Sequence, residues 1–117
     1  MIRLKRIYEQ PEPSDGRRIL VDRIWPRGVS KQDACLDQWM KELAPSSELR
    51  KLFCHDPERF DEFAHRYRQE IDSDDTRRQL FSQLKEWSAH EVVTLVYAAK
   101  DQEHNQAVVL RNLLEES

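Results

Sequence analysis

The sequence predicts a small, helix-rich α/β protein in which helices flank a mostly parallel sheet of three or four strands. The segment 92–99, VVTLVYAA, is apolar and rich in β-branched residues, which is typical of a central strand covered on both faces. The chain has only two glycines, which argues against a turn-rich all-β fold and against Gly-rich phosphate loops. At 117 residues we expect a single domain, 1–117.

Two further strands are expected near the N-terminus. Residues 2–8 alternate apolar and basic side chains, as in a strand with one exposed side. Two prolines and an Asp-Gly pair at 10–16 mark a surface loop, and a second strand follows at 18–25. That loop is shorter than the dozen or so residues that a parallel crossover usually needs. These residues alone therefore favour a hairpin.

Apolar side chains recur with helical spacing through the rest of the chain. Pro45 should end the first helix, whose apolar residues Leu36, Trp39, Met40 and Leu43 follow the i, i+3, i+4, i+7 pattern. The sequence Asp56-Pro57-Glu58 has an N-cap acceptor followed by proline at the first helical position. Helices are expected at 36–43, from Ser46 or Ser47 through Phe53, at 56–71, from the 73–75 cap to about 90, and from Ala107 to the C-terminus.

Composition excludes several classes of function. The net charge of -3 gives no global basic footprint, so nucleic acid is a minority hypothesis for a partner. Cys35 and Cys54 form no CxxC pair and the four histidines show no metal-ligand spacing, so we expect reduced thiols, no metal and no cofactor. Without a membrane-length apolar run or a signal-peptide pattern, a cytoplasmic protein without membrane contact is expected.

Three segments together carry a family resemblance. They are LVDRIWPRG at 20–28, LDQWMKELAPSSELRKLFCHDPERFDEFAHRY at 36–67 and TLVYAAKDQEHNQAVVL at 94–110. In this order and spacing they resemble the short, YeaO-like branch of the domain of unknown function 488 family. The resemblance implies a small, mostly bacterial, cytosolic α/β protein without a settled biochemical activity. It also implies that the first two strands are parallel, because a helix fills their connection in longer relatives.

One position departs from the pattern of the family. Where short relatives tend to carry Asn-His-Ala after the last strand, this chain has Asn105-Gln106-Ala107, and a histidine stands nearby as His104. If the family's histidine serves as an acid or base, the substitution weakens catalysis here. If that histidine only donates a hydrogen bond, Gln106 can do the same.

Charged residues follow two of the predicted strands, at Asp22-Arg23 and at Lys100-Asp101. Ligands of open α/β sheets bind outside the carboxyl ends of the strands, so these charges predict a site for an anionic small molecule. Arginine and lysine suit phosphate or carboxylate, a helix begins near Asn105 with free N–H groups, an aromatic ring forms a wall, and Asp22 orients an arginine or acts as a base. The expected ligand-binding residues are Asp22, Arg23, Trp25, Arg27, Tyr97, Lys100 and Asn105.

Alternatives stay open at this point. Asp22 and Arg23 can form a structural ion pair, Trp25 can be core, and Pro26-Arg27-Gly28 has the form of a type I turn. A second polar group comprises Lys41, Ser46, Arg50 and His55, in which Ser46 also suits a helix cap. Whether the protein is an enzyme is left open by these residues. The alternative function is a non-catalytic interaction module, associated with nucleic acid or regulatory, that uses Trp25, Arg27 and the loop to Lys31.

Overall fold

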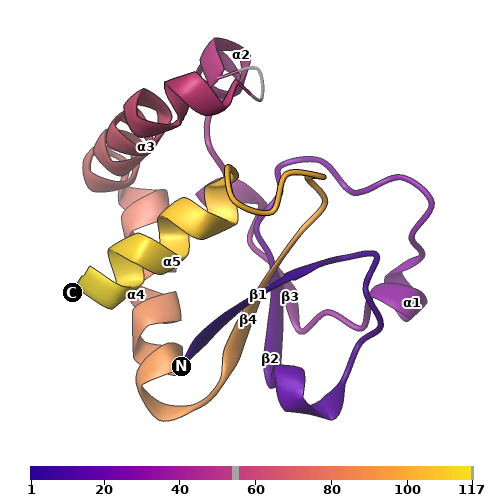
Figure 1. The fold of residues 1–117 in the computed structure, drawn as a ribbon. Helices are drawn as coiled ribbons and strands as arrows, with labels where there is room; N and C mark the ends of the chain where they lie inside the picture. The colour runs from indigo at the N-terminus through magenta and orange to yellow at the C-terminus, as the bar shows by residue number, and fades with distance from the viewer. Residues whose placement is uncertain (54–55, 117) are drawn as a thin grey trace.

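The computed structural model describes residues 1–53 and 56–116, and at its centre lies a parallel four-stranded sheet (Figure 1). The strands follow the order β1-β4-β2-β3, and every neighbouring pair is parallel. All residues of β4 are buried, which confirms the central strand that its apolar sequence predicts. The bounds are Ile2–Arg6 for β1, Arg17–Leu20 for β2, Gln38–Trp39 for β3 and Val93–Tyr97 for β4.

The first two strands are parallel but are not neighbours, because β4 lies between them. The hairpin favoured by the short loop is therefore wrong, and the parallel arrangement implied by the family resemblance is confirmed. The connection 7–16 includes one turn of 3-10 helix, η1 (Pro13–Asp15). A hydrogen bond holds this connection against β4, because the Thr94 hydroxyl donates to the Asp15 carbonyl at 2.6 Å.

Helices make up most of the remaining chain (Figure 1). The helices predicted after Ser46, after Asp56, after Asp74 and near Ala107 are all present. Within the described residues, none is both long and apolar enough to cross a membrane. The helices are α1 (Lys31–Ala34), η2 (Lys41–Leu43), α2 (Ser47–Phe53), η3 (Pro57–Arg59), α3 (Phe60–Ser73), α4 (Asp75–His90) and α5 (Gln106–Glu116).

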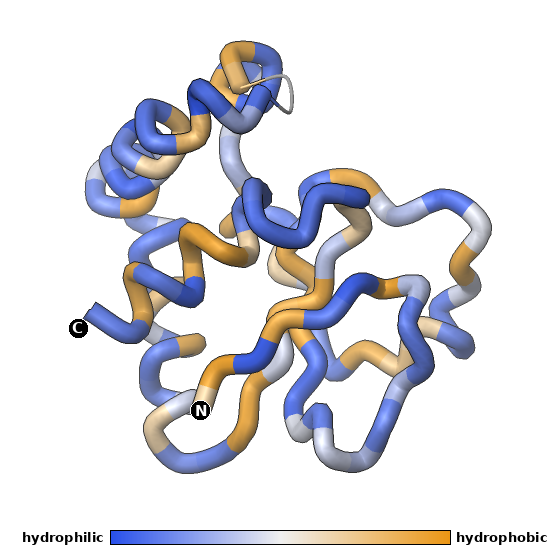
Figure 2. Tube along the Cα trace, viewed as in Figure 1, coloured by the Kyte–Doolittle hydropathy of each residue, from blue (hydrophilic) through white to orange (hydrophobic). Residues whose placement is uncertain are grey.

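The strands present alternate residues to two different layers. Ile19 and Leu95 face a large core that also contains residues of α3, α4 and α5. Leu20 and Val96 face a smaller cluster covered by Ala34 of α1 and by the loop between β2 and α1. In Figure 2 the helices alternate between apolar and polar residues along the chain, as helices with one side on a core should.

The helix predicted at 36–43 is wrong. In its place the chain forms β3 and then η2. The edge of β2 is the reason, because its backbone carbonyls at Arg18 and Leu20 accept hydrogen bonds from Asp37 and Met40, each at 2.9 Å. The apolar residues of this segment divide between the layers: Leu36 and Trp39 pack in the smaller cluster, while Met40 and Leu43 pack in the large core.

Candidate functional site

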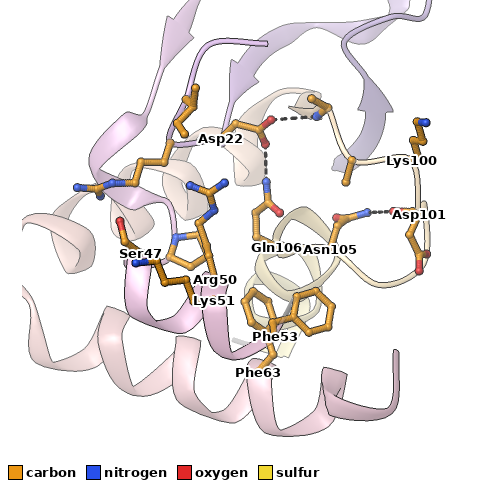
Figure 3. A pocket seen from close by; sticks show the side chains of 15 residues that line it. Asp22, Ser47, Arg50, Lys51, Phe53, Phe63, Lys100, Asp101, Asn105 and Gln106 are labelled. Carbon is orange, nitrogen blue, oxygen red and sulfur yellow. Dashed lines mark hydrogen bonds between the residues drawn. The ribbon is translucent and has the colours of Figure 1, made fainter. Parts of the chain in front are cut away.

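A cavity of about 790 Å³ opens beside the carboxyl ends of β2 and β4 and the start of α5 (Figure 3). Residues of α2 and α3 complete its wall. Its volume falls in the range of small-molecule binding sites. Because this edge is where open α/β sheets hold ligands, we take the cavity as the candidate site and refer to it as the strand-end pocket.

Asp22 lines the pocket at the point where β2 and β4 separate. The last backbone hydrogen bond between these segments runs from the Val21 amide to the Val96 carbonyl, at 3.0 Å. One step further, the Asp22 carboxylate accepts a hydrogen bond from the Ala98 amide, also at 3.0 Å. The Asp22 carboxylate thus takes the place of a backbone carbonyl where β2 turns away from β4. This role explains structurally why a charged residue follows the apolar run of β2.

The second oxygen of the Asp22 carboxylate accepts a hydrogen bond from the side-chain amide of Gln106, the first residue of α5. Burial raises the pKa of Asp22 to about 6, although the Ala98 amide, the nearby Arg50 guanidinium and Gln106 all favour the charged form. A carboxyl group in this state gains or loses its proton close to neutral pH. Carboxyl groups with pKa values raised in this way are frequent at functional sites.

Four cationic side chains line the same pocket: Arg23 from the segment after β2, Arg50 and Lys51 from α2, and Lys100 from the segment after β4. Within the described part of the chain, Arg23, Arg50 and Lys100 form no ion pair and no side-chain hydrogen bond. The Asp22-Arg23 ion pair that a purely structural interpretation predicts is therefore absent.

The start of α5 is held by local hydrogen bonds. The Asn105 side chain accepts from the Val108 amide at 3.0 Å and donates to the Asp101 carbonyl at 2.8 Å. The Asp101 carboxylate accepts from the Glu103 and His104 amides and lies 2.9 Å from the His104 ring, and these contacts lower its pKa. His104 also packs edge-on against Phe60. The His104 ring therefore contacts Asp101. The side chain that contacts Asp22 is that of Gln106, not that of His104.

The pocket combines these polar groups with an apolar wall. The rings of Phe53 and Phe63 stack with centroids 4.5 Å apart, at the side of the pocket below Gln106 in Figure 3. Both residues are almost completely buried, so only small parts of their rings reach the cavity. The apolar lining residues are Ile24, Pro45, Phe53, Phe63, Ala98 and Ala99.

Three of the predicted ligand-binding residues lie outside the pocket. Tyr97 is buried in the large core, and Trp25 packs edge-on against Trp39 while its indole N–H donates to the Val29 carbonyl at 2.7 Å. Arg27 is exposed in the turn with Gly28, and its carbonyl accepts a hydrogen bond from Tyr8. The structure thus brings Asp22, Arg23, Lys100 and Asn105 to one pocket, and the expectation that Arg27 joins them is wrong.

The second predicted group also divides. Arg50 lines the pocket, but Ser46 caps α2 by accepting from the Leu49 amide at 3.2 Å and donates to Glu70. Lys41 is exposed, with its ammonium 5.6 Å from the centre of the Trp39 ring. His55 lies outside the described residues. Within those residues, no three His, Cys, Asp or Glu side chains gather as a metal ion requires.

Sequence reasoning missed several lining residues. Phe53 and Phe63 carry the ordinary signal of a helix core, so nothing in their spacing marks them as pocket residues. Asp101, by contrast, directly follows Lys100 at a strand end, and that position is a signal that could have found it. Ser47 and Lys51 enter the wall only because α2 packs against this edge of the molecule.

The fold and the pocket define a helix-rich α/β protein with a charged cavity at the carboxyl edge of a parallel sheet. The whole chain, residues 1–117, matches the family described as the inactive DUF488-N3 subclade, and the chain belongs to this family.

Two relatives cover almost the same length. The Mycobacterium tuberculosis protein called uncharacterized protein Rv3073c is 43% identical over 113 residues, which is 97% of this chain and 92% of the relative. The Escherichia coli protein called uncharacterized protein YeaO is 42% identical over 113 residues, with 97% and 96% covered. No solved structure matches the chain.

Proposed function

We propose that the protein binds an anionic small molecule, one that carries a carboxylate or phosphate group, in the strand-end pocket. The observation that carries this proposal is that three of the four pocket cations, Arg23, Arg50 and Lys100, form no ion pair with an acid among the described residues. Cations that line a pocket without internal partners keep their attraction for an anionic ligand.

Binding without turnover fits the pocket better than catalysis does. No histidine or cysteine is among the described residues that line it, so these residues supply neither a thiol nucleophile nor an imidazole base. The description of the family as inactive favours the same role. Among the described lining residues, Asp22 has a pKa raised to about 6, which suits proton transfer close to neutral pH.

A panel of ligands tests the proposal. Phosphate, sulfate, nucleotides, sugar phosphates and small carboxylates are titrated against the protein while its melting temperature is measured. A ligand that binds only the folded state must raise the melting temperature in a dose-dependent way. We expect a rise for at least one anion, reduced in Arg50→Gln and unchanged in Arg27→Gln, an arginine of the same net charge outside the pocket. Equal rises in both variants, or none in any, would contradict an anion site here.

One observation favours a second candidate, an interaction module on the segment 24–31. Arg27 and Lys31 are exposed, and Ile24 is 65% exposed. Trp25, however, is packed against Trp39, so it offers no free ring for stacking. Salt-sensitive binding to single- or double-stranded DNA or RNA that Arg27→Gln abolishes and Arg50→Gln leaves intact would support this candidate over the pocket.

A further inference from the structure

Two opposite charges in the strand-end pocket face each other without joining. Arg50 is close enough to favour the charged form of Asp22, and both side chains line the same cavity. Yet the Asp22 carboxylate is held by the Ala98 amide and by Gln106, and Arg50 forms no ion pair among the described residues. The pocket therefore holds a negative group, Asp22, and a positive group, Arg50, that are not paired with each other. We call them the negative and the positive pole of the pocket.

A ligand with only an anionic group satisfies one pole and is repelled by the other. Its carboxylate or phosphate pairs with Arg50 but then lies near the ionised Asp22, and like charges brought together in a binding site oppose association. A ligand with an ammonium group next to a carboxylate satisfies both poles. Each carboxylate oxygen of Asp22 accepts one hydrogen bond from the protein and keeps a further acceptor site for such an ammonium.

The rest of the pocket lining indicates the size and polarity of the remainder of this ligand. Its cavity of about 790 Å³ leaves room beyond the two charged groups. That room is bordered by Phe53 and Phe63 from the helices and by Ala98 and Ala99 from the segment after β4. An apolar side chain placed there leaves water and gains contacts with the two alanines and with the small parts of the rings that reach the cavity.

We propose that the ligand is a zwitterion of the α-amino-acid type with a large apolar side chain, bound with its ammonium on Asp22 and its carboxylate on Arg50. This inference rests on the proposed function, because the ligand's carboxylate is the anion of that proposal. It adds the requirement that the same ligand also carries a positive group. Arg23 and Lys100 then supply the long-range attraction that draws the carboxylate end into the pocket.

A matched set of small molecules tests the inference by calorimetric titration at pH 7.5 and low salt. Phenylalanine carries both charges, 3-phenylpropionate lacks the ammonium, phenethylamine lacks the carboxylate and glycine lacks the ring. We expect phenylalanine to bind at least about tenfold more tightly than each of the other three, since each lost charge-assisted hydrogen bond or apolar contact is worth about that factor.

Two variants assign the effect to the proposed pole. Asp22→Asn should remove the preference for phenylalanine over 3-phenylpropionate, whereas Asp33→Asn, the same change at an exposed site on α1, should keep it. Circular dichroism checks that both variants are folded. Arg50→Gln should weaken phenylalanine and 3-phenylpropionate alike.

The outcomes separate the two proposals. Binding of 3-phenylpropionate, or of a phosphate from the earlier panel, as tight as that of phenylalanine overturns the zwitterion inference and leaves the anion site standing. Glycine binding as tightly as phenylalanine overturns the apolar part of the inference. A preference for phenylalanine that persists in Asp22→Asn overturns the assignment to Asp22. No binding by any of the four probes overturns the zwitterion inference, and the anion proposal is overturned as well if the earlier panel also shows no binding.

Discussion

Gln106 donates a hydrogen bond to the carboxylate of Asp22, so the first residue of α5 closes one side of the pocket that begins at the end of β2. In the pattern that this sequence resembles, a histidine tends to occupy the position of Gln106. An amide can hold the carboxylate as an imidazole N–H does, but it cannot take up and release a proton near neutral pH. The contact therefore holds the carboxylate through a group that does not titrate near neutral pH, in accord with a family described as inactive.

The raised pKa of Asp22 is open to direct measurement. Carboxyl-carbon NMR should show Asp22 titrating at about pH 6, because burial disfavours its charged form. In Arg50→Gln the midpoint should move higher, since the nearby guanidinium stabilises the carboxylate. Arg27→Gln, exposed and outside the pocket, should leave the midpoint where it is. A midpoint near 4 in the unmodified protein would refute this view of the pocket.

The same pKa predicts how the stability of the protein depends on pH. Asp22 binds its proton more tightly in the folded chain, at about 6, than in the unfolded chain, near 3.8. This acid therefore lowers the free energy of unfolding as pH rises from about 4 to 6, by roughly 2 kcal/mol once its partial exposure is considered. The penalty is complete above pH 6.

Asp22→Asn removes that penalty. Asparagine still accepts the Ala98 hydrogen bond, and Gln106 can turn its amide to accept one from the new side chain. Urea unfolding should therefore show the variant to be more stable than the unmodified protein at pH 8, by about 2 kcal/mol, with the two converging near pH 4. A difference that is the same at both pH values would mean that packing, not ionisation, sets the effect. A gain in stability alongside lost binding is the pattern expected of a functional acid.

Much of the sheet could be predicted from the sequence, because burial leaves a strong trace. The run that became β4 is apolar at nearly every position since both faces are covered, and no surface element needs such a sequence. The segment 36–43 shows the limit of this reasoning. The spacing of its apolar residues fits a helix. The segment forms β3 and η2 instead, because its backbone bonds to the edge of β2 and its apolar side chains pack in two different cores. Those contacts come from residues far away in the chain, which periodicity does not report.

The pocket residues that follow the ends of strands could be predicted from the sequence. The pocket residues that come from helices could not. Asp22, Arg23 and Lys100 stand directly after apolar runs, so a parallel sheet must bring them to one edge. The arginine found there from α2 is Arg50, whereas Arg27 is exposed in the turn with Gly28, outside the pocket. Which helix packs over an edge, and with which face, depends on the whole core. The role of the Phe53 and Phe63 wall follows from that packing alone.

A buried ion pair holds the connection between β1 and β2. The Arg18 guanidinium lies 2.7 Å from the Asp15 carboxylate, and both side chains are almost fully buried. Asp15→Ala leaves Arg18 charged inside the protein without its carboxylate, which should cost about 3 to 5 kcal/mol of unfolding free energy.

Glu12 provides the matched control for this pair. It contacts Lys5, which also contacts Asp15, but it is largely exposed, so Glu12→Ala should cost less than about 1 kcal/mol. Chemical denaturation of the two variants measures both values. Similar costs would show that burial does not govern this network.

The two glycines offer a final comparison, because both have positive φ but different surroundings. At Gly16, with φ of 62°, an added Cβ would lie 2.3 Å from the Val92 carbonyl oxygen, so the connection would have to move away from β4. Gly28 has φ of 75° and open space around the same position.

We expect Gly28→Ala to cost about 1 kcal/mol, from backbone conformation alone. Gly16→Ala adds a steric clash and should cost at least about 2 kcal/mol, with a fall in melting temperature several degrees larger. Equal losses would mean that the loop at 7–16 can shift without disturbing the sheet. The close approach of Gly16 to Val92 would then be incidental to the parallel crossover.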